Sequence, residues 1–398
     1  MFLNLNRLDQ PLKASIASNS YKTYRVIIQC SAMTEHIEKK IKSYRGIVLY
    51  CLSYINCIAA IISPSAVKRL LEFPYVKHIF LDEYAFLCGS SVSSLNRVNF
   101  QTASKLTGKG VTIGLIDTGT YPHADLIYPK NKIIKFTDNI NNLRYPYDDN
   151  GHGTFISGII AGSGKLSSGM YKGIAVNSNI YSIKAFNSIG RGFISDILYS
   201  MEFLLNDSSS YNIKIITLPF ELTGHNINIV SLFNKYFQIA KNNNIVIVVP
   251  AGHNGNTQCS IQGIAALDNC ITVGGLDTTS DKISAYKYSS CGPLGKLNKP
   301  DLSAACVNIC SLNTNANFVS ERNGRKLYPL ALSSNYTTYS GTSCAAAYIS
   351  GICALLFERN PELTFNDILS ILTASCNLMD IPKWLQGSGI VDVNRLFS

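Results

Sequence analysis

Short apolar runs and stretches of small residues set the pattern of the C-terminal part of the chain. Val111–Ile116 and Ile245–Val249 are largely apolar, which is typical of parallel strands buried on both faces. Phe155–Gly162 and Ala345–Leu356 mix small and apolar residues, which favours buried helices. Asn366–Ser375 predicts a further helix. The pattern therefore indicates an α/β domain.

Residues 1–91 follow a different pattern and are predicted to form a separate unit, with residues 1–21 as a flexible N-terminal extension. The expected elements are a strand at Tyr24–Gln29, a helix at Thr34–Tyr44, strands at Gly46–Tyr50 and Asn56–Ile62, a helix at Ser63–Leu71 capped by Ser63 or Ser65, and a strand at Val76–Leu81. This βαββαβ order predicts a small α+β domain of the ferredoxin-like type.

The segment Gly46–Ser63 is apolar enough to invite a membrane interpretation. A spanning helix needs about 20 consecutive apolar residues. This segment is shorter, is interrupted by Ser53 and Asn56, and is rich in β-branched residues. We therefore expect two sheet strands here and no membrane span.

Composition fits a soluble globular enzyme, because 46% of the 398 residues are hydrophobic and 15% are charged. The net charge of +10 is spread over both predicted units, with 11 Lys and Arg against 6 Asp and Glu in residues 1–91 and the same excess of five in the rest. Neither a basic block nor a nucleic-acid motif accompanies this charge, so we expect no nucleic-acid partner.

Twelve cysteines are scattered without Cys-x-x-Cys pairs, which argues against a zinc site and against a disulfide framework. Met1–Asp9 lacks the basic region and apolar core of a secretory signal. The sequence thus predicts an intracellular protein, or a secreted one only if the N-terminus given is incomplete.

Three short motifs carry the candidate chemistry. Asp117-Thr118-Gly119 closes the first apolar strand, Gly151-His152-Gly153-Thr154 follows, and Gly341-Thr342-Ser343 opens the late helical stretch. A serine hydroxyl needs an imidazole to accept its proton and a carboxylate to fix the tautomer of that imidazole. The motifs supply these groups in the order Asp, His, Ser, which is the subtilisin order.

Other interpretations of the motifs require features that the chain lacks. Asp-Thr-Gly is a common turn, and as half of an aspartic-protease dyad it would need a dimer, because no second copy occurs. A lipase would need a Gly-x-Ser-x-Gly elbow with the histidine last in the chain. Cys344 could suggest a cysteine protease, but a small helix-packing residue explains it better.

From about residue 92 to the end, the chain resembles the subtilases, the subtilisin-like serine peptidases. The resemblance rests on the three motifs, the small-residue helix after His152, the segment Tyr339–Leu356 around Ser343, and the closing segment Gly387–Asn394. It implies a three-layer α/β fold with a mostly parallel central sheet over residues 92–398. It also implies a monomeric serine endopeptidase with Asp117, His152 and Ser343 as the catalytic triad, acting on proteins or peptides without a cofactor.

The resemblance implies an oxyanion donor from an Ala-Gly-Asn motif after a buried strand. Here the segment reads Pro250-Ala251-Gly252-His253-Asn254, so an ungapped match places His253 at the donor position. Histidine has an N–H in either tautomer, and a shift of one residue in the loop would present Asn254 instead. Both residues are candidates.

The substrate groove that the resemblance implies is altered in this chain. The family has a Ser-Leu-Gly strand, which pairs with the substrate and walls the specificity pocket, in the stretch that is Ile215–Glu221 here, and Pro219 and Phe220 are unusual in it. Proline removes a backbone donor from that strand. Glu221 would favour a basic substrate side chain unless it is merely a solvated carboxylate. The other candidate substrate-binding residues are Gly190, Arg191, Gly192 and Gly252.

A structural calcium ion is found in some subtilases, and Asp125-Leu126 resembles a segment that helps to bind it. The stretch Gly162–Ser168 lacks the carboxylates and amides of the family's calcium loop. We therefore expect no bound metal.

Residues 1–91 resemble the inhibitor-type prodomain of subtilases. The resemblance implies an intramolecular chaperone whose tail, near Tyr84–Cys88, lies in the active-site groove, with cleavage between about Leu87 and Ser94. The alternative is a pseudoprotease that keeps the fold and binds peptides or a protease partner, which the altered groove would suit. Asn313–Asn335 is expected to form an extended loop that shapes substrate access.

Overall fold

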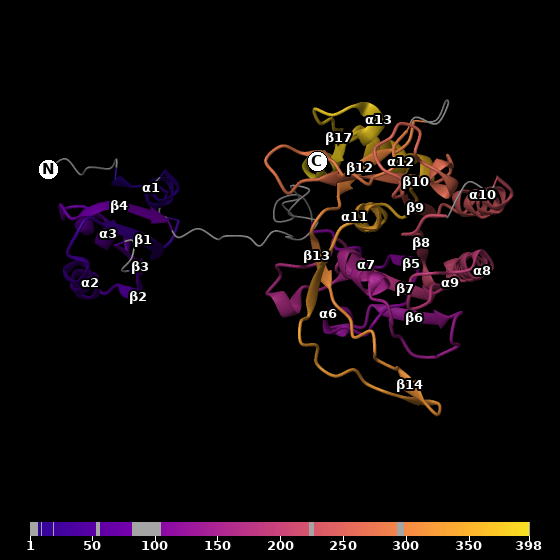
Figure 1. Cartoon of the computed structure of the whole chain (residues 1–398), viewed down its shortest axis with the longest axis horizontal. Helices are drawn as coiled ribbons and strands as arrows, with labels where there is room; N and C mark the ends of the chain where they lie inside the picture. The colour runs from indigo at the N-terminus through magenta and orange to yellow at the C-terminus, as the bar shows by residue number, and fades with distance from the viewer. Residues whose placement is uncertain are drawn as a thin grey trace. The chain divides into compact units, whose positions relative to one another are not determined.

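The structure is a computed structural model of the chain that describes residues 7–8, 10–18, 20–52, 56–81, 105–222, 227–292 and 298–397. It divides into two compact units, Met1–Phe86 and Leu87–Ser398 (Figure 1). The predicted boundary after residue 91 and the predicted cleavage segment lie outside the described residues. Each unit is described by itself below.

The first unit contains a four-stranded antiparallel sheet with the strand order β2-β3-β1-β4. Its elements are α1 (Gln10–Ala17), β1 (Tyr24–Cys30), α2 (Thr34–Ser43), β2 (Ile47–Leu52), β3 (Cys57–Ile62), α3 (Pro64–Leu70) and β4 (Val76–Leu81). From β1 onward this is the βαββαβ order, and each element lies within two residues of its expected position. Ser63 caps α3, because its hydroxyl accepts a hydrogen bond from the Ala66 amide.

The N-terminal extension is not the flexible segment that the sequence pattern predicts. Part of it forms α1, and Leu12 of this helix is completely buried in the core of the unit. The Arg7 guanidinium donates to the carbonyl oxygens of Leu71, Phe73 and Val76. Leu12 and Arg7 therefore hold this segment. Single contacts of this kind leave no periodic pattern in the sequence.

The second unit is built on a ten-stranded sheet with the main order β17-β18-β12-β10-β9-β8-β5-β7-β6, to which β11 adds beside β10. Its strands are β5 (Thr112–Asp117), β6 (Ile133–Asp138), β7 (Asn179–Lys184), β8 (Ile213–Thr217), β9 (Val246–Pro250), β10 (Ile271–Asp277), β11 (Ser284–Ala285), β12 (Leu302–Ala305), β17 (Cys376–Asn377) and β18 (Ile390–Val391). All pairings are parallel except those of β11 and β17. The mostly parallel sheet that the resemblance implies is confirmed.

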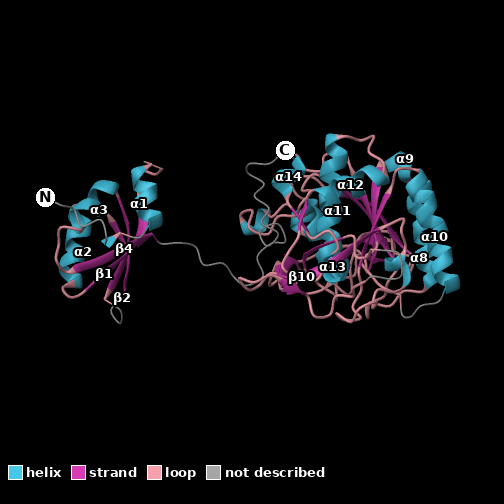
Figure 2. Cartoon of the chain, turned by 90° about the horizontal axis from the view of Figure 1, so that it is seen from above, coloured by secondary structure: helices cyan, strands magenta, loops and turns pink. Residues whose placement is uncertain are grey.

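Helices cover both faces of this sheet, as the continuously apolar strands require. The longer helices are α7 (His152–Ala161), α8 (Ile194–Asn206), α10 (Ile227–Asn242), α11 (Thr342–Arg359) and α12 (Phe365–Ala374), and the shorter ones are α6 (Ala124–Ile127), η3 (Lys165–Ser167), α9 (Ser208–Tyr211), η4 (Gly263–Ala266), α13 (Lys383–Gln386) and α14 (Val393–Phe397). Figure 2 shows the strands between α11 and α12 on one side and α8 and α10 on the other.

Two hydrophobic cores follow from this layering. Along β5, Ile113 and Leu115 belong to the core shared with α7 and α11, whereas Ile116 belongs to the core shared with α8 and α10. Gly114 faces α8, and a side-chain carbon there would lie 2.7 Å from Leu204 Cδ1. The strand alternates between the cores, so β5 is fixed on both faces and its last residue, Asp117, has a defined position.

The segment Asn313–Asn335 is more ordered than a plain loop. β13 (Ile309–Leu312) and β16 (Tyr336–Tyr339) pair antiparallel at its base, and β14 (Glu321–Arg322) pairs with β15 (Arg325–Lys326) near its tip. Figure 1 shows this arm extending from the body of the second unit. None of the helices in the described ranges is both long and apolar enough to cross a membrane.

Candidate active site

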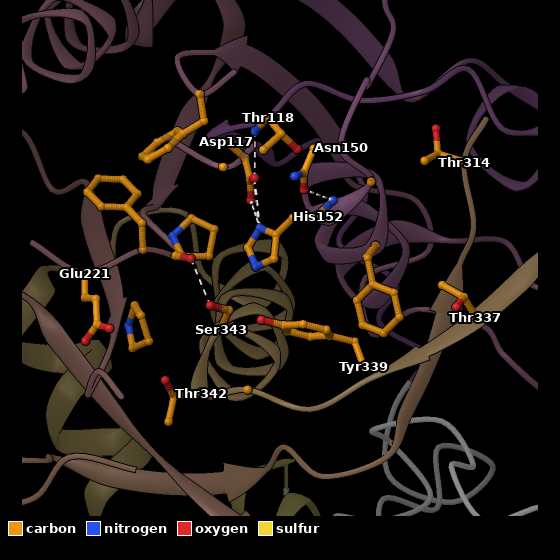
Figure 3. Close-up of a pocket in the computed structure, with 18 of the residues that line it drawn as sticks. Asp117, Thr118, Asn150, His152, Glu221, Thr314, Thr337, Tyr339, Thr342 and Ser343 are labelled. Atoms are coloured by element: carbon orange, nitrogen blue, oxygen red, sulfur yellow. Dashed lines mark hydrogen bonds and ion pairs between the residues drawn. The ribbon is translucent and has the colours of Figure 1, made fainter. Parts of the chain in front are cut away.

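The three candidate catalytic residues lie at the ends of three different elements. Asp117 is the last residue of β5, His152 is the first residue of α7, and Ser343 is the second residue of α11. The Asp117 carboxylate oxygens each lie 2.8 Å from His152 Nδ1. Figure 3 shows the imidazole between Asp117 and Ser343.

The Ser343 hydroxyl donates its hydrogen bond to the Pro219 carbonyl oxygen at 2.8 Å (Figure 3). Ser343 lies in the first turn of α11, where backbone N–H groups have no partner within the helix. These N–H groups and the partial positive charge of the helix end suit a developing negative charge beside the serine.

Glycines on both sides of His152 allow α7 to begin against the end of β5. Gly151 caps the helix at φ 111°, a left-handed conformation that favours glycine. A side-chain carbon on Gly153 would collide with the Gly119 carbonyl and lie 3.2 Å from Asp117 Cβ. The Gly-His-Gly pattern thus brings the imidazole within reach of the carboxylate.

Asp148 holds the start of α7, a role that the sequence interpretation missed. Its buried carboxylate accepts hydrogen bonds from the amides of Gly151 and Thr154 and from the Thr118 and Thr154 hydroxyls. Asp148 lies three residues before the N-cap residue, Gly151, so the usual N-cap pattern does not reveal this role.

Lys184 is a second residue that the motifs did not reveal. Its ammonium group is fully buried at the end of β7 and donates to the carbonyls of Thr118 and Phe186 and to the Asp149 carboxylate at 2.5 Å. It therefore joins β5, β7 and the loop that precedes His152. A lone lysine in a strand gives no sequence signal for such a role.

The pKa of His152 is raised above the ordinary value of 6.5. Burial favours the neutral ring, but the charge and hydrogen bond of Asp117 and the charge of Asp148 together outweigh it. The carboxylates thus stabilise an imidazolium, the form that results when His152 accepts a proton.

The triad opens into a cleft with a volume of about 700 Å3. Besides the triad, the candidate residues that line it are Gly190, Pro219, Phe220, Glu221, Gly252 and His253. Arg191 and Gly192 follow Gly190 in the same loop but do not line the cleft. Leu312, Asn313 and Thr314 contribute from the base of the arm.

The structure distinguishes the two oxyanion candidates by position. His253 lines the cleft, and its ring stacks on Tyr288 at a centroid distance of 5.0 Å. Asn254 does not line the cleft, and its side-chain amide donates to the Ser260 carbonyl at 3.4 Å. His253, which the ungapped match to the Ala-Gly-Asn motif places at the donor position, is thus the candidate that lines the cleft.

The strand expected to pair with substrate ends before the substituted residues. β8 stops at Thr217, and Phe220 N donates to the Leu218 carbonyl in a tight turn. The Phe220 ring packs against Phe186, and both line the cleft. Pro219 thus bends the segment away from strand geometry and leaves its carbonyl to Ser343.

Tyr339 lines the cleft beside His152, the candidate general base. Its ring lies edge-on to His152 and to Phe155, each at a centroid distance of 5.8 Å. Tyr339 belongs to the segment around Ser343, and no motif in the sequence predicted a role for its side chain. Cys344, in contrast, is fully buried, and burial raises the pKa of its thiol, so it is a packing residue.

The residues at the expected calcium position do not fit a metal ion. The Asp125 carboxylate accepts hydrogen bonds from the Ser163 hydroxyl, the Leu166 amide and the Tyr336 hydroxyl. Its backbone carbonyl accepts from the ammonium of the buried Lys132. These donors use the oxygens that a calcium ion would need, and within the described ranges no three His, Cys, Asp or Glu residues gather into a metal site.

Comparison with known proteins agrees with this site. Residues 108–389 match the model of the subtilase family, peptidase family S8. The chain is 34% identical to serine protease AprX of Bacillus subtilis over 80% of this chain and 73% of that protein. It is 24% identical to a thermostable alkaline protease of Halalkalibacterium halodurans over 95% of this chain and 93% of that protein.

The solved structure of sphericase gives a TM-score of 0.62 at 21% identity, covering 77% of this chain and 99% of that one. The family match spans most of the chain and contains all three motif residues. The chain therefore belongs to the subtilase family and is a subtilisin-like serine endopeptidase.

Proposed function

We propose that this endopeptidase cleaves peptide bonds with Ser343 as nucleophile, His152 as general base and Asp117 as the residue that orients the base. The observation that carries the proposal is the contact of both Asp117 oxygens with His152 Nδ1 in the cleft that Ser343 lines. This contact fixes the proton on Nδ1 and leaves Nε2 free to accept one.

The reaction proceeds in two balanced halves. Ser343 Oγ bonds to the carbonyl carbon of the peptide as its proton passes to His152, and this proton then goes to the leaving amine as the C–N bond breaks. A water molecule repeats the sequence on the acyl-enzyme and releases the acid. The hydrogen bond from Ser343 to Pro219 must exchange for one to His152 before attack.

The negative charge on the carbonyl oxygen is stabilised by the Ser343 backbone N–H and by the ring of His253. The first-turn position of Ser343 and the place of His253 in the cleft support this assignment. Gly190 and its neighbours Arg191 and Gly192 form the rim on which an extended peptide would pair by edge addition.

The first unit is proposed to be an inhibitory prodomain that assists folding and occupies the cleft through its C-terminal tail. Its ferredoxin-like sheet order and its place before the catalytic unit support the proposal. The proposed cleavage lies between about Leu87 and Ser94.

Intact mass spectrometry of purified full-length protein tests both proposals together. The wild type and a control, Ser334→Ala, are expected to yield a fragment that begins between about residues 88 and 94, whereas Ser343→Ala remains full length. Ser334 is an exposed residue before β16 and outside the cleft. Identical full-length masses in all three proteins, with no hydrolysis of added casein, would instead support the pseudoprotease alternative.

A further inference from the structure

Two acidic residues, Asp117 and Glu221, are among the described residues that line the cleft. Of these two, Glu221 has no positively charged partner in the lining. The other carboxylate there, Asp117, is engaged by His152 and by the Thr118 amide. Glu221 accepts a hydrogen bond from the His253 backbone amide at 2.8 Å, and no lysine or arginine is among the described residues of the lining. The cleft therefore presents a negative charge that its own walls leave unpaired.

This carboxylate lines the same cleft as the nucleophile. Glu221 lies two residues after Pro219, whose carbonyl accepts the hydrogen bond of Ser343. Its Oε2 lies over Gly252, where an added side-chain carbon would be only 2.8 Å away. In Figure 3, Glu221 lies on the same side of the cleft as Thr342, opposite Thr337 and Tyr339.

The surfaces around Glu221 suit a long side chain that is apolar along its length and charged at its end. Pro219, Phe220 and Pro250 supply apolar walls, and the lack of a side chain at Gly252 lets the Glu221 carboxylate lie against the backbone there. Lysine and arginine bury their methylene groups on such walls while the terminal cation reaches a carboxylate.

We propose that Glu221 selects a lysine or arginine side chain immediately before the scissile bond. The inference rests on the proposed function, because it assigns the substrate residue next to the carbonyl that Ser343 attacks. Glu221 is exposed, so solvent screens its charge. A bound peptide displaces water, so an apolar side chain leaves the carboxylate desolvated without a partner, whereas a cation pairs with it.

Two peptide anilides that differ only at this position test the inference. One carries lysine and the other carries norleucine, which has nearly the same length and no charge. We expect the wild type to favour lysine by about tenfold in kcat/KM, as for a charge pair that substrate binding desolvates. In Glu221→Gln, which keeps an acceptor for the His253 amide, the ratio should fall to about one.

A matched variant controls for net charge. Glu202→Gln removes an equal charge from α8, where the carboxylate accepts from Tyr236 outside the cleft, and it should keep the wild-type ratio. Equal ratios in wild type and Glu221→Gln would show that the carboxylate only braces the His253 loop, and the inference would fall. If Glu221→Gln does not fold, the wild-type ratio must still decrease as salt is raised, and a constant ratio overturns the inference.

A fluorophosphonate label separates this inference from the proposed function. If the wild type takes the label at Ser343 but cleaves both anilides equally, only the proposed lysine preference is refuted. If the wild type takes no label and cleaves neither peptide, the proposed catalytic function is refuted, and the inference about Glu221 is refuted with it. The peptides are supplied in solution because residues 87–94 contain no lysine or arginine, and a tethered segment is cleaved at high effective concentration whatever its preference.

Discussion

Individual side chains around His152 determine how this site responds to pH. Asp117 contacts the imidazole directly, and Asp148 adds a second negative charge while it holds the start of α7. Because these groups raise the pKa of His152, they stabilise the protonated ring. Their contribution to folding stability is complete below the unfolded pKa of 6.5 and is lost as pH rises through the folded value.

Catalysis has the opposite pH dependence, because only neutral His152 can accept the serine proton. We expect the acid limb of kcat/KM to lie above pH 6.5 and to move to lower pH in Asp148→Asn, which removes one of the raising charges. The pH–rate profiles of the two proteins measure this shift. Asp207→Asn, whose carboxylate binds Tyr181 away from the cleft, serves as the control.

A limb that stays in place in Asp148→Asn would contradict the electrostatic role of Asp148. A loss of activity without a shift of the acid limb would mean that Asp148 acts only by holding the start of α7.

His253 provides a second test at the scale of one residue. Loss of an oxyanion donor costs about 10²–10³ in kcat, a magnitude measured on a subtilisin, so His253→Ala should lose activity of that order. His253→Asn supplies an amide donor from the same position and should retain most of the wild-type rate. Steady-state kinetics on one peptide substrate decide the matter, and an unimpaired His253→Ala would exclude the ring as a donor.

At the scale of elements, hydrogen bonds of one buried carboxylate join α6 to the loop at η3. Asp125 at the start of α6 binds Ser163, Leu166 and Tyr336, and the last of these ties the base of the arm to the body. Lys132 donates to the backbone carbonyls of Asp125 and Ala161, and burial lowers the pKa of its ammonium to about 8.

This arrangement predicts that calcium does not stabilise the Asp125 site. In Ser343→Ala, which prevents self-digestion, EDTA and excess calcium should give the same melting temperature. Adding Tyr336→Phe should lower the stability by about 1–3 kcal/mol in either condition, because a buried carboxylate loses its donor. A melting temperature that EDTA lowers, and that Asp125→Asn makes insensitive to EDTA, would show a metal at this position.

The sequence pattern predicts the elements that are buried on both faces more completely than those held by single contacts. The strand β5 lies within one residue of its expected position, because it is buried along its whole length and its sequence is mostly apolar. The helix α1 was not predicted, because Leu12 and Arg7 fix it through contacts with residues far along the chain. Likewise, no pattern shows that Pro219 would give its carbonyl to Ser343.

The roles of His253 and Asn254 depend on the path of the loop that holds them. Adjacent polar residues in a loop can exchange roles through one backbone rotation, so the sequence left both open. The structure turns Asn254 toward Ser260 and leaves His253 in the cleft. The sequence alone therefore does not tell which loop residue faces the cleft. The triad residues were predictable because they lie at the ends of a strand and two helices.

At the scale of the molecule, the chain consists of two units with separate hydrophobic cores. If the first unit assists the folding of the second, damage to its core should reduce the yield of active enzyme without touching the site. Ile28→Ala empties a completely buried position of the first unit, which costs about 2–5 kcal/mol.

We expect Ile28→Ala to give less fluorophosphonate-reactive protein per mole of chain after refolding, while Lys39→Ala, an exposed change on α2, behaves as wild type. Active-site titration of refolded samples measures the yield. Equal yields from Ile28→Ala and wild type would remove the folding role from the first unit.

Peptide mapping of protein treated with a fluorophosphonate is the most direct test of the proposed catalytic triad. The probe reacts only with a serine whose base and orienting acid are in place. We expect a single modified residue, Ser343, in the wild type, and little or no modification in His152→Ala and Asp117→Ala. Modification of another serine, or equal modification of Ser343 in all three proteins, would contradict a triad made of these residues.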